Sequence, residues 1–303
     1  MVQGVVVINK ERDFTSFDVV AVCRRIFGQK AVGHTGTLDP MAEGVLPVCL
    51  GRATKLTDML ISAEKSYLCE MELGRTTDTD DSTGNEISHI EADVLDKVTE
   101  DDVRAALESY VGEFLQVPPR YAAIKINGKK LYEYAREGVE IDVPGRTVRI
   151  YSITVREIRL PFVSFHVHCS KGTYIRSLCR DVGQKLGTGA VMTGLVREES
   201  AGFTLLDAYT LKELEQLKDE GRLEEAVLPM DALLSGFPAL DITIDGEKRL
   251  RNGNPLLKED VAGEGLTHGR IYRIYMSGQL AALYSWDENK KQLRNKKMLT
   301  DFI

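Results

Sequence analysis

The residue types best suited to chemistry are concentrated in one short segment, residues 33–47. It contains His34 and Asp39 among three glycines, which allow a ligand to approach the backbone closely. Asp39 precedes a proline, so its carboxylate is expected on a rigid loop, where it could act as a covalent nucleophile. Taken singly, Asp39 is typical of a turn and His34 of a hydrogen-bonded loop histidine. Together with the glycines, they favour a functional carboxylate.

A second segment, residues 169–180, supplies a cation that could partner this carboxylate. Arg176 falls in the first turns of a predicted helix, just off its apolar stripe. A guanidinium there could pair with a buried carboxylate and oppose the rise in pKa that burial causes. The alternative is a surface cation at helical spacing with Arg180.

Other chemistries have weaker support in the sequence. Residues 183–194 contain four glycines without the spacing of a phosphate-binding loop. His166 and His168 share one face of a predicted strand, but no companion ligand is obvious, so a solvated or hydrogen-bonded face is favoured over a metal site. The five cysteines are scattered in hydrophobic contexts, which indicates core residues in a reducing compartment.

Regular periodicity predicts the elements that must position these residues. Alternation of apolar and polar residues predicts strands at residues 2–9, 65–74, 121–127, 147–158 and 162–169. Helical spacing predicts a first helix capped by Ser16 and further helices over residues 100–111, 129–137, 173–186 and 211–220. Capping-box patterns at Thr99 and Thr210 open the helices at 100–111 and 211–220. Residues 28–47 are rich in Gly, Thr, Asp and Pro and are expected to form a long irregular loop.

The length and the tail of the chain indicate two domains. A single core stops growing at about 250–300 residues, and the chain has 303 residues. After residues 236–240 the sequence changes to short β-type runs, including residues 271–276 and 279–285 joined by a Ser-Gly pair, which predict a hairpin. We therefore predict an α+β protein with domains at residues 1–236 and 237–303.

Charge is unevenly distributed along the chain. The net charge is -7, yet basic residues dominate residues 146–180 while acidic residues dominate residues 72–113. A basic face is therefore possible, although charge alone favours ordinary surface patchiness over nucleic-acid binding. No apolar run approaches 18 residues and the N-terminus lacks a cleavable leader pattern, so we expect an unanchored cytoplasmic protein.

The sequence resembles the TruB family of bacterial tRNA pseudouridine-55 synthases. Residues 33–46 match the family motif G-H-T-G-x-L-D-P-x-A-x-G-x-L. Further matches follow in order, at residues 51–55, 65–67, 77–84, 116–125, 131–136 and 170–176. One departure lies in residues 10–16, where the family's K-P-x-G-x-T-S pattern has Glu11 and Asp13 in place of Pro and Gly. This departure leaves the geometry of that turn open.

The resemblance implies a fold and a set of site residues. The fold would be a pseudouridine-synthase catalytic domain, a mainly antiparallel mixed sheet flanked by helices, followed by a small PUA-like C-terminal β-domain. Asp39 would be the nucleophile, Arg176 its ion-pair partner and Tyr67 the ring that stacks on the target base. The implied substrate-binding residues are His34, which would hold the extruded conformation, Asp81, Tyr174, Leu195, Lys10 and Lys55.

The implied activity is isomerisation of uridine to pseudouridine at position 55 in the T loop of tRNA, by base flipping. It has no net redox change, so no cofactor and no metal are expected. The expected partner is tRNA, clasped by an insertion at about residues 117–146, with no membrane and no obligate protein partner, and the protein is expected to be a monomer.

Three points stay open at this stage. The protein could assist tRNA folding as well as modify it; the intact set Asp39, Tyr67 and Arg176 argues against a purely non-catalytic chaperone. A guide-dependent synthase of ribonucleoprotein particles is an alternative, but such enzymes usually carry extra basic extensions. Asp39 could attack the sugar C1′, add to the base at C6, or assist elimination through a glycal.

Overall fold

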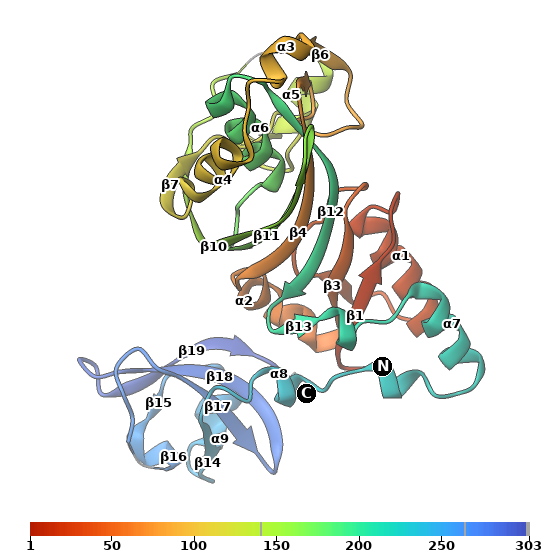
Figure 1. Ribbon diagram of the computed structural model, residues 1–303. Helices are drawn as coiled ribbons and strands as arrows, with labels where there is room; N and C mark the ends of the chain where they lie inside the picture. The colour runs from red at the N-terminus through yellow and green to blue at the C-terminus, as the bar shows by residue number, and fades with distance from the viewer. Residues whose placement is uncertain (140, 264, 301–303) are drawn as a thin grey trace.

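The computed structural model describes residues 1–139, 141–263 and 265–300. Two β-sheets follow one another along the chain, each with its own apolar core (Figure 1). The sheet of the first core belongs to the larger lobe, and the second forms a separate lobe beyond the end of helix α8 (Met230–Leu233). The apolar faces of the two sheets therefore form two separate cores.

The large sheet contains nine strands in the order β1-β3-β12-β4-β11-β10-β7, with β2 paired to β3 and β13 paired to β12. Its pairings are antiparallel except for the parallel pairing of β3 with β12. This confirms the predicted mainly antiparallel mixed sheet. The strands are β1 (Gly4–Lys10), β2 (Val32–His34), β3 (Glu43–Leu50), β4 (Lys65–Leu73), β7 (Gly112–Gln116), β10 (Arg146–Arg159), β11 (Phe162–Cys169), β12 (Ala190–Ser200) and β13 (Phe203–Thr204).

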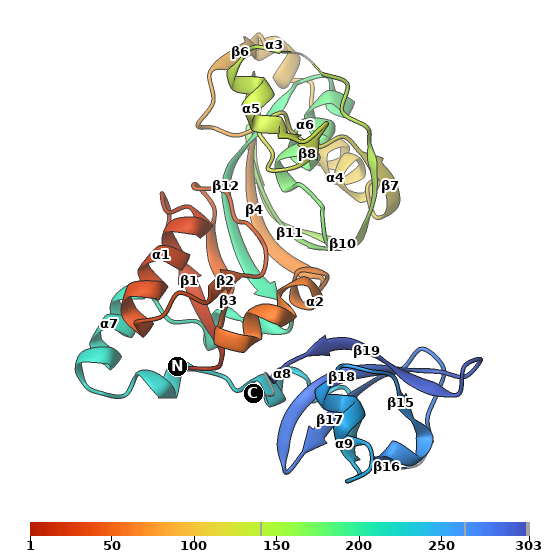
Figure 2. The ribbon, with the colours of Figure 1, turned by 180° about the vertical axis from the view of Figure 1, so that it is seen from behind.

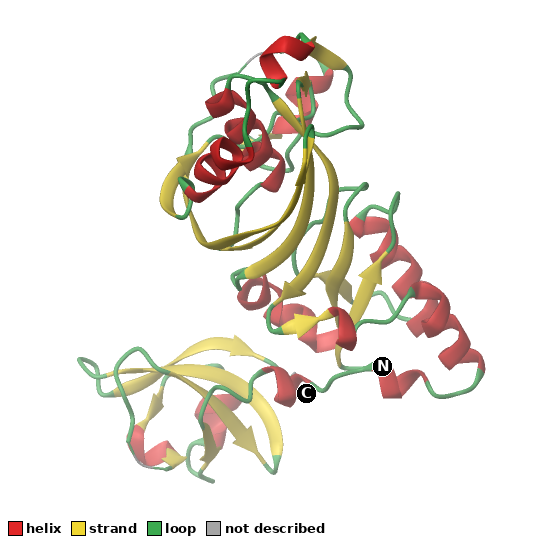
Figure 3. Cartoon of the chain, viewed as in Figure 1, coloured by secondary structure: helices red, strands yellow, loops and turns green. Residues whose placement is uncertain are grey.

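Helices flank this sheet at two places (Figure 3). Helix α1 (Ser16–Phe27) packs against β2 and against α7 (Leu211–Asp219), near the β1 edge. Helix α6 (Ile175–Leu186) packs on β12 and β4, and α4 (Glu100–Glu108) packs on α6. The predicted capping boxes at Thr99 and Thr210 are confirmed. The large lobe also contains the short helices α2 (Thr57–Ile61), α3 (Ala92–Leu95) and α5 (Leu131–Arg136) and the 3-10 turns η1 (Gly51–Leu56), η2 (Leu205–Asp207) and η3 (Leu223–Ala226).

The small sheet has six strands in the order β15-β19-β18-β17-β14-β16. The predicted hairpin is confirmed, because β17 and β18 are antiparallel neighbours joined by Ser277 and Gly278, both at positive φ. The elements of this lobe are β14 (Ala239–Ile242), α9 (Glu247–Arg251), β15 (Leu256–Leu257), η4 (Lys258–Asp260), β16 (Val261–Ala262), β17 (Ile271–Met276), β18 (Gln279–Asp287) and β19 (Gln292–Met298).

Two sequence predictions were wrong in part. Residues 28–47 are not one irregular loop, because strand β2 and most of β3 lie within them and only residues 35–42 lie between these strands. The glycines and prolines concealed a buried strand, whose continuous apolar run is what a central strand requires. Of residues 121–127, only β8 (Lys125–Ile126) is a strand, paired with β9 (Lys129–Lys130). β8 and β9 form a separate two-stranded sheet, so only the two residues that pair in each arm are strand.

The start of α1 also differs from the prediction. Thr15, not Ser16, is the N-cap, because its side chain accepts the backbone N–H of Asp18. Ser16 is then available for a different contact, described below.

Figure 2 shows the region around α5 and β8 at the same end of the molecule as α4 and α6. The hairpin of β5 (Arg75–Thr77) and β6 (Glu86–His89) lies at this end too. None of the helices described is long and apolar enough to cross a membrane.

Candidate active site

Asp39 lies in the turn between β2 and β3, and contacts on both sides hold that turn. The Leu38 N–H donates to Ser16 Oγ at 2.8 Å, and the Ser16 hydroxyl lies 3.2 Å from the Leu38 carbonyl. On the other side, Lys10 Nζ donates to the Pro40 carbonyl at 3.2 Å. The connection between β1 and α1 therefore fixes the backbone before and after Asp39.

At the departure from the family pattern, Asp13 adopts the backbone conformation that a glycine would favour. Its φ is 68°, in the left-handed region. Aspartate is one of the few other residues that adopts this region at low cost. Its N–H donates to the Pro40 carbonyl at 2.8 Å, which adds a further tie to the Asp39 turn.

Arg176 is the direct partner of Asp39. Its Nη2 donates to Asp39 Oδ1 at 3.1 Å, and its Nε lies 2.9 Å from Asp39 Oδ2 as an ion-pair contact without hydrogen-bond alignment. The Arg176 side chain is 5% exposed and that of Asp39 is 33% exposed. The guanidinium is therefore covered while part of the carboxylate stays accessible to a ligand.

Three further acceptors hold the guanidinium. Arg176 Nη1 donates to Asp81 Oδ2 at 3.3 Å and to the Thr79 carbonyl at 3.0 Å, and Nη2 donates to the Tyr121 carbonyl at 3.1 Å. Asp81 is itself buried, and its Oδ1 accepts from Thr79 and Thr83. The structure thus places Asp81 behind Arg176, where it positions the guanidinium.

The pKa of Asp39 is raised above its ordinary value. Burial is the largest cause, and the neighbouring charge of Asp81 adds to it, whereas Arg176 and Lys10 act in the opposite direction. The prediction that Arg176 opposes the effect of burial on the pKa of Asp39 is thus correct in direction, although the effect of burial is larger.

Tyr67, Leu195 and His34 come from three strands of the large sheet. Tyr67 on β4 and Leu195 on β12 are both largely buried, and burial raises the pKa of Tyr67 to about 12. His34 ends β2, and its Nδ1 accepts the N–H of Gly36 at 3.3 Å. Burial, followed by the charge of Arg197, lowers the pKa of His34, so this histidine is neutral near pH 7.

The other predicted substrate-binding residues lie in different environments. Lys10 has no exposed surface and donates to the carbonyls of Glu11, Phe14 and Pro40, and burial lowers its pKa to about 8. Tyr174 caps α6, and its backbone exchanges two hydrogen bonds with Gln116. Lys55 is half-buried in η1. Lys10 therefore supports the Asp39 turn from inside, and direct contact of these three with a substrate stays a prediction.

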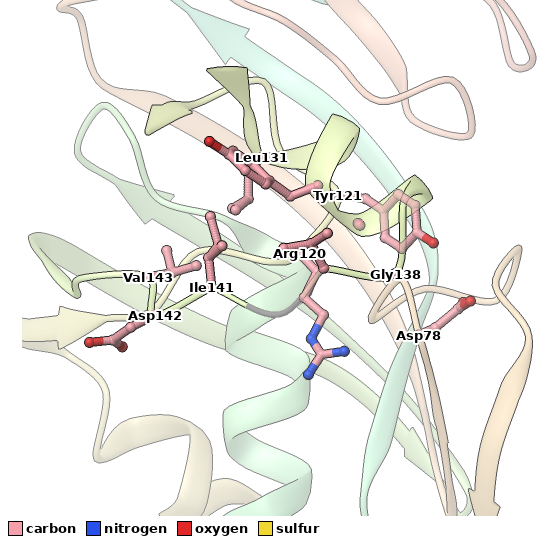
Figure 4. A pocket seen from close by; sticks show the side chains of 11 residues that line it. Asp78, Arg120, Tyr121, Leu131, Gly138, Ile141, Asp142 and Val143 are labelled. Atoms are coloured by element: carbon pink, nitrogen blue, oxygen red, sulfur yellow. The ribbon is translucent and has the colours of Figure 1, made fainter. Parts of the chain in front are cut away.

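A cavity of about 400 Å³ lies beside Tyr121 (Figure 4). Its wall includes Tyr121, whose carbonyl accepts from Arg176. Arg120 and Asp142 bring opposite charges to it, and α5 contributes Leu131 and Tyr134. Apart from Asp78, its lining residues all fall within residues 120–143, inside the insertion predicted at residues 117–146.

The site has no metal-ligand cluster among the residues that the structure describes. His166 contacts Glu198 at 2.7 Å and His168 lies 3.1 Å from Glu64, which confirms the predicted hydrogen-bonded strand face. The five cysteines are all buried and unpaired, which confirms their prediction as core residues.

Sequence reasoning missed two residues at the site. Ser16 was assigned to a helix cap, whereas it binds both backbone polar groups of Leu38. Arg197 on β12 was not considered, and because Glu198 and Glu199 follow it in the strand, the local sequence pattern gives no signal of its burial.

Two solved structures share the fold of nearly the whole chain. The first is a Cbf5-Nop10-Gar1 complex, with a TM-score of 0.73 and 28% identity over 98% of this chain and 85% of that chain. The second is an H/ACA RNP bound to a substrate RNA containing 2′-deoxyuridine, with a TM-score of 0.71 and 26% identity over 98% and 85% of the two chains. The fold, with its small PUA-like C-terminal β-domain, and the site define a pseudouridine synthase.

Family models and relatives narrow this class. The model for the TruB family pseudouridylate synthase N-terminal domain matches residues 24–175, and that for the tRNA pseudouridylate synthase B C-terminal domain matches residues 176–235. The tRNA pseudouridine synthase B of Clostridium kluyveri is 42% identical over 91% of this chain and 92% of its own length. That of Bacillus pumilus is 40% identical over 97% and 96%. The chain belongs to the TruB family of pseudouridylate synthases.

Proposed function

We propose that this enzyme isomerises uridine 55 in the T loop of tRNA to pseudouridine, by flipping the base and using Asp39 as a nucleophile. The observation that carries the proposal is the Asp39–Arg176 ion pair, with a covered cation and a carboxylate that is 33% exposed. Membership of the TruB family and relatives named tRNA pseudouridine synthase B support the choice of substrate.

The reaction sets the chemical demands on the site. The bond between N1 and C1′ breaks, a bond between C5 and C1′ forms, the proton leaves C5, and N1 gains a proton. A carboxylate that adds covalently divides this change into easier steps. Attack at C1′, addition at C6 and assistance of a glycal route all need the ionised form of Asp39, which Arg176 favours.

The target base must leave the folded loop, which costs a few kcal/mol. Tyr67 offers a ring for stacking beside the Asp39 turn, and neutral His34 can fill space in the loop without adding positive charge. RNA loops are recognised by such stacking and by backbone contacts. Leu195 supplies an apolar neighbour from β12.

The insertion at residues 117–146 is proposed to clasp the tRNA. Lys129 lies over the ring of Tyr134, and Lys130 and Arg136 lie over the ring of Tyr132. Cations beside aromatic rings suit a phosphate backbone and unstacked bases. The lobe of residues 237–303 is proposed as a second domain that contacts the tRNA acceptor stem.

We further infer a cytoplasmic monomer that needs no obligate protein partner. One chain supplies the nucleophile, the cation and the stacking ring, so no second subunit is needed to complete the set. Activity on a bare tRNA transcript would support this inference, whereas a strict requirement for a guide RNA or a protein partner would contradict it.

The test of the nucleophile is the Asp39→Asn variant with tRNA tritiated at C5 of uridine. We expect tritium release to be lost while tRNA binding by filter assay stays within about threefold of wild type, since the amide keeps the shape of the side chain. Undiminished release by Asp39→Asn contradicts the nucleophile assignment. Mapping pseudouridine in the product tests position 55 independently.

Assistance of tRNA folding is a separable activity. If it exists, Asp39→Asn retains it, because folding assistance depends on binding and not on the carboxylate. Comparison of wild type and this variant in a tRNA refolding assay measures it directly.

A further inference from the structure

Arg197 is a fully buried arginine in the large sheet. It lies on β12 without exposed surface and is among the largest fully buried side chains. Its neighbours in the sheet are Tyr67 on β4 and Gly44 on β3. Burial, the largest influence, lowers the pKa of Arg197, and the neighbouring Tyr67 phenol acts in the opposite direction.

The guanidinium of Arg197 joins the two ends of the Asp39 turn. Its Nε donates to the Val45 carbonyl at 2.7 Å and its Nη2 donates to the Gly36 carbonyl at 3.3 Å. These two carbonyls stand on either side of Asp39 in the sequence. The Tyr67 hydroxyl is a further polar neighbour, and its oxygen could act toward Arg197 only as an acceptor, because a guanidinium can only donate.

A cation buried without a carboxylate is costly, so its contacts must offset the lost hydration. The carbonyl oxygens of Val45 and Gly36 offset this loss only if they stay at hydrogen-bonding distance, and the neighbouring Tyr67 phenol adds a polar atom on the β4 side. The cost of separating Arg197 from these acceptors therefore keeps the Asp39 turn and the Tyr67 ring at a fixed separation. The pairing between β12 and β4 shifts register beside Arg197, between residues 197 and 199, which is common next to active sites.

We propose that Arg197 is a positioning residue for the isomerisation, which fixes the Asp39 turn relative to the Tyr67 ring so that both can act on one base. The inference rests on the proposed function, because it assumes that Asp39 attacks and that Tyr67 stacks. Arg197 differs in this from Arg176, which contacts the reacting carboxylate itself.

The test compares Arg197→Lys and Arg197→Met with Arg25→Met, which removes an exposed arginine of α1 paired with Glu215. We expect Arg197→Met to lower the single-turnover rate at saturating tRNA by about 100-fold, since a displacement of about 1 Å costs that much. The Kd for tRNA stays within about threefold, because Arg197 does not reach the surface. Arg197→Lys restores part of the rate, and Arg25→Met matches wild type.

A double-mutant cycle separates positioning from stability. Arg197→Lys and Tyr67→Phe are both conservative, so the cycle decides the question even if Arg197→Met does not fold. If Arg197 acts through the Tyr67 hydroxyl, the effects of the two changes on the single-turnover rate are not additive. Additive effects, or Arg197 variants that lower only the thermal midpoint and react at the wild-type rate when folded, overturn the proposal.

Asp39→Asn assayed in parallel distinguishes the two hypotheses. If it still releases tritium, the proposed function fails whatever Arg197 does. If it is inactive while Arg197→Lys and Arg197→Met react like wild type, only the role of Arg197 fails.

Discussion

The two sheets of this molecule bury different kinds of side chain. Around the Asp39 turn and its sheet, the buried charged residues are Lys10, Lys65, Asp81, Arg176 and Arg197. In the described part of the small lobe, Asp260 is the only charged residue buried to this degree, and it accepts the N–H of Leu257. Burial of charge is costly. Because the buried charged residues are concentrated at the large sheet, we infer that the large sheet carries the chemistry. The small sheet is stabilised mainly by apolar packing.

The largest expected effect tests the charged side of this comparison. Arg176→Met leaves Asp39 and Asp81 together without their shared cation. We expect the single-turnover rate to fall by a factor on the order of 10³, and unfolding in urea to show a loss of about 3–5 kcal/mol.

Arg273→Met is the matched control in the small lobe. Arg273 pairs with Asp231, which is half exposed, so water can solvate the Asp231 carboxylate when Arg273 is removed. The single-turnover rate of Arg273→Met should stay within about twofold of wild type, because Asp231 is half exposed and such a pair contributes little. An equal loss of rate in both variants would contradict the contrast between the lobes.

The next expected effect tests the apolar side. Leu293 is fully buried in the core of the small sheet, and Leu46 is fully buried in that of the large sheet. Either change to alanine should cost about 2–5 kcal/mol of stability by calorimetry or denaturant unfolding. Only Leu46→Ala should also lower the single-turnover rate of the folded enzyme, since β3 carries the Asp39 turn. A rate loss with Leu293→Ala would show that the small lobe supports catalysis.

The sequence predicted the parts of the site that depend on local pattern. Alternation gave β4 and β11, helical spacing gave α6, and the pair of Asp39 with Arg176 followed from one loop and one helix. A resemblance to a known family then supplied roles for residues far apart in the chain. Both kinds of information come from residue types and their spacing, which can be interpreted without knowledge of the fold.

The contacts that the sequence could not predict are tertiary ones. Arg197 looks like an ordinary strand residue until β12 lies between β3 and β4, where its side chain reaches Gly36 and Val45. The role of Ser16 likewise depends on the approach of α1 to the Asp39 turn. Strand β3 was missed because its proline and glycine outweighed its apolar run in a local reading.

A smaller effect concerns the pH dependence of the charged site. The pKa of Asp39 is raised, and the charge of Asp81 contributes to the rise. Activity that needs the carboxylate is therefore lost as the pH falls through this raised pKa. Asp81→Asn removes the negative charge, so we expect the acid limb of the profile of kcat/KM to move to lower pH. A limb that moves to higher pH would reverse the assigned sign.

The smallest expected effect lies where the two lobes meet. Lys297 of β19 pairs with Asp58 of α2 at 3.3 Å, but the Asp58 side chain is 82% exposed. Beside this pair, an apolar cluster joins the lobes through Leu56, Leu283 and Leu299. Lys297→Ala should therefore change the unfolding free energy by less than about 1 kcal/mol, and Leu283→Ala should cost about 2–5 kcal/mol. If Lys297→Ala lowered the unfolding free energy more than Leu283→Ala, the two lobes would be joined mainly by charge. The buried apolar cluster between them would then contribute less to stability than its burial indicates.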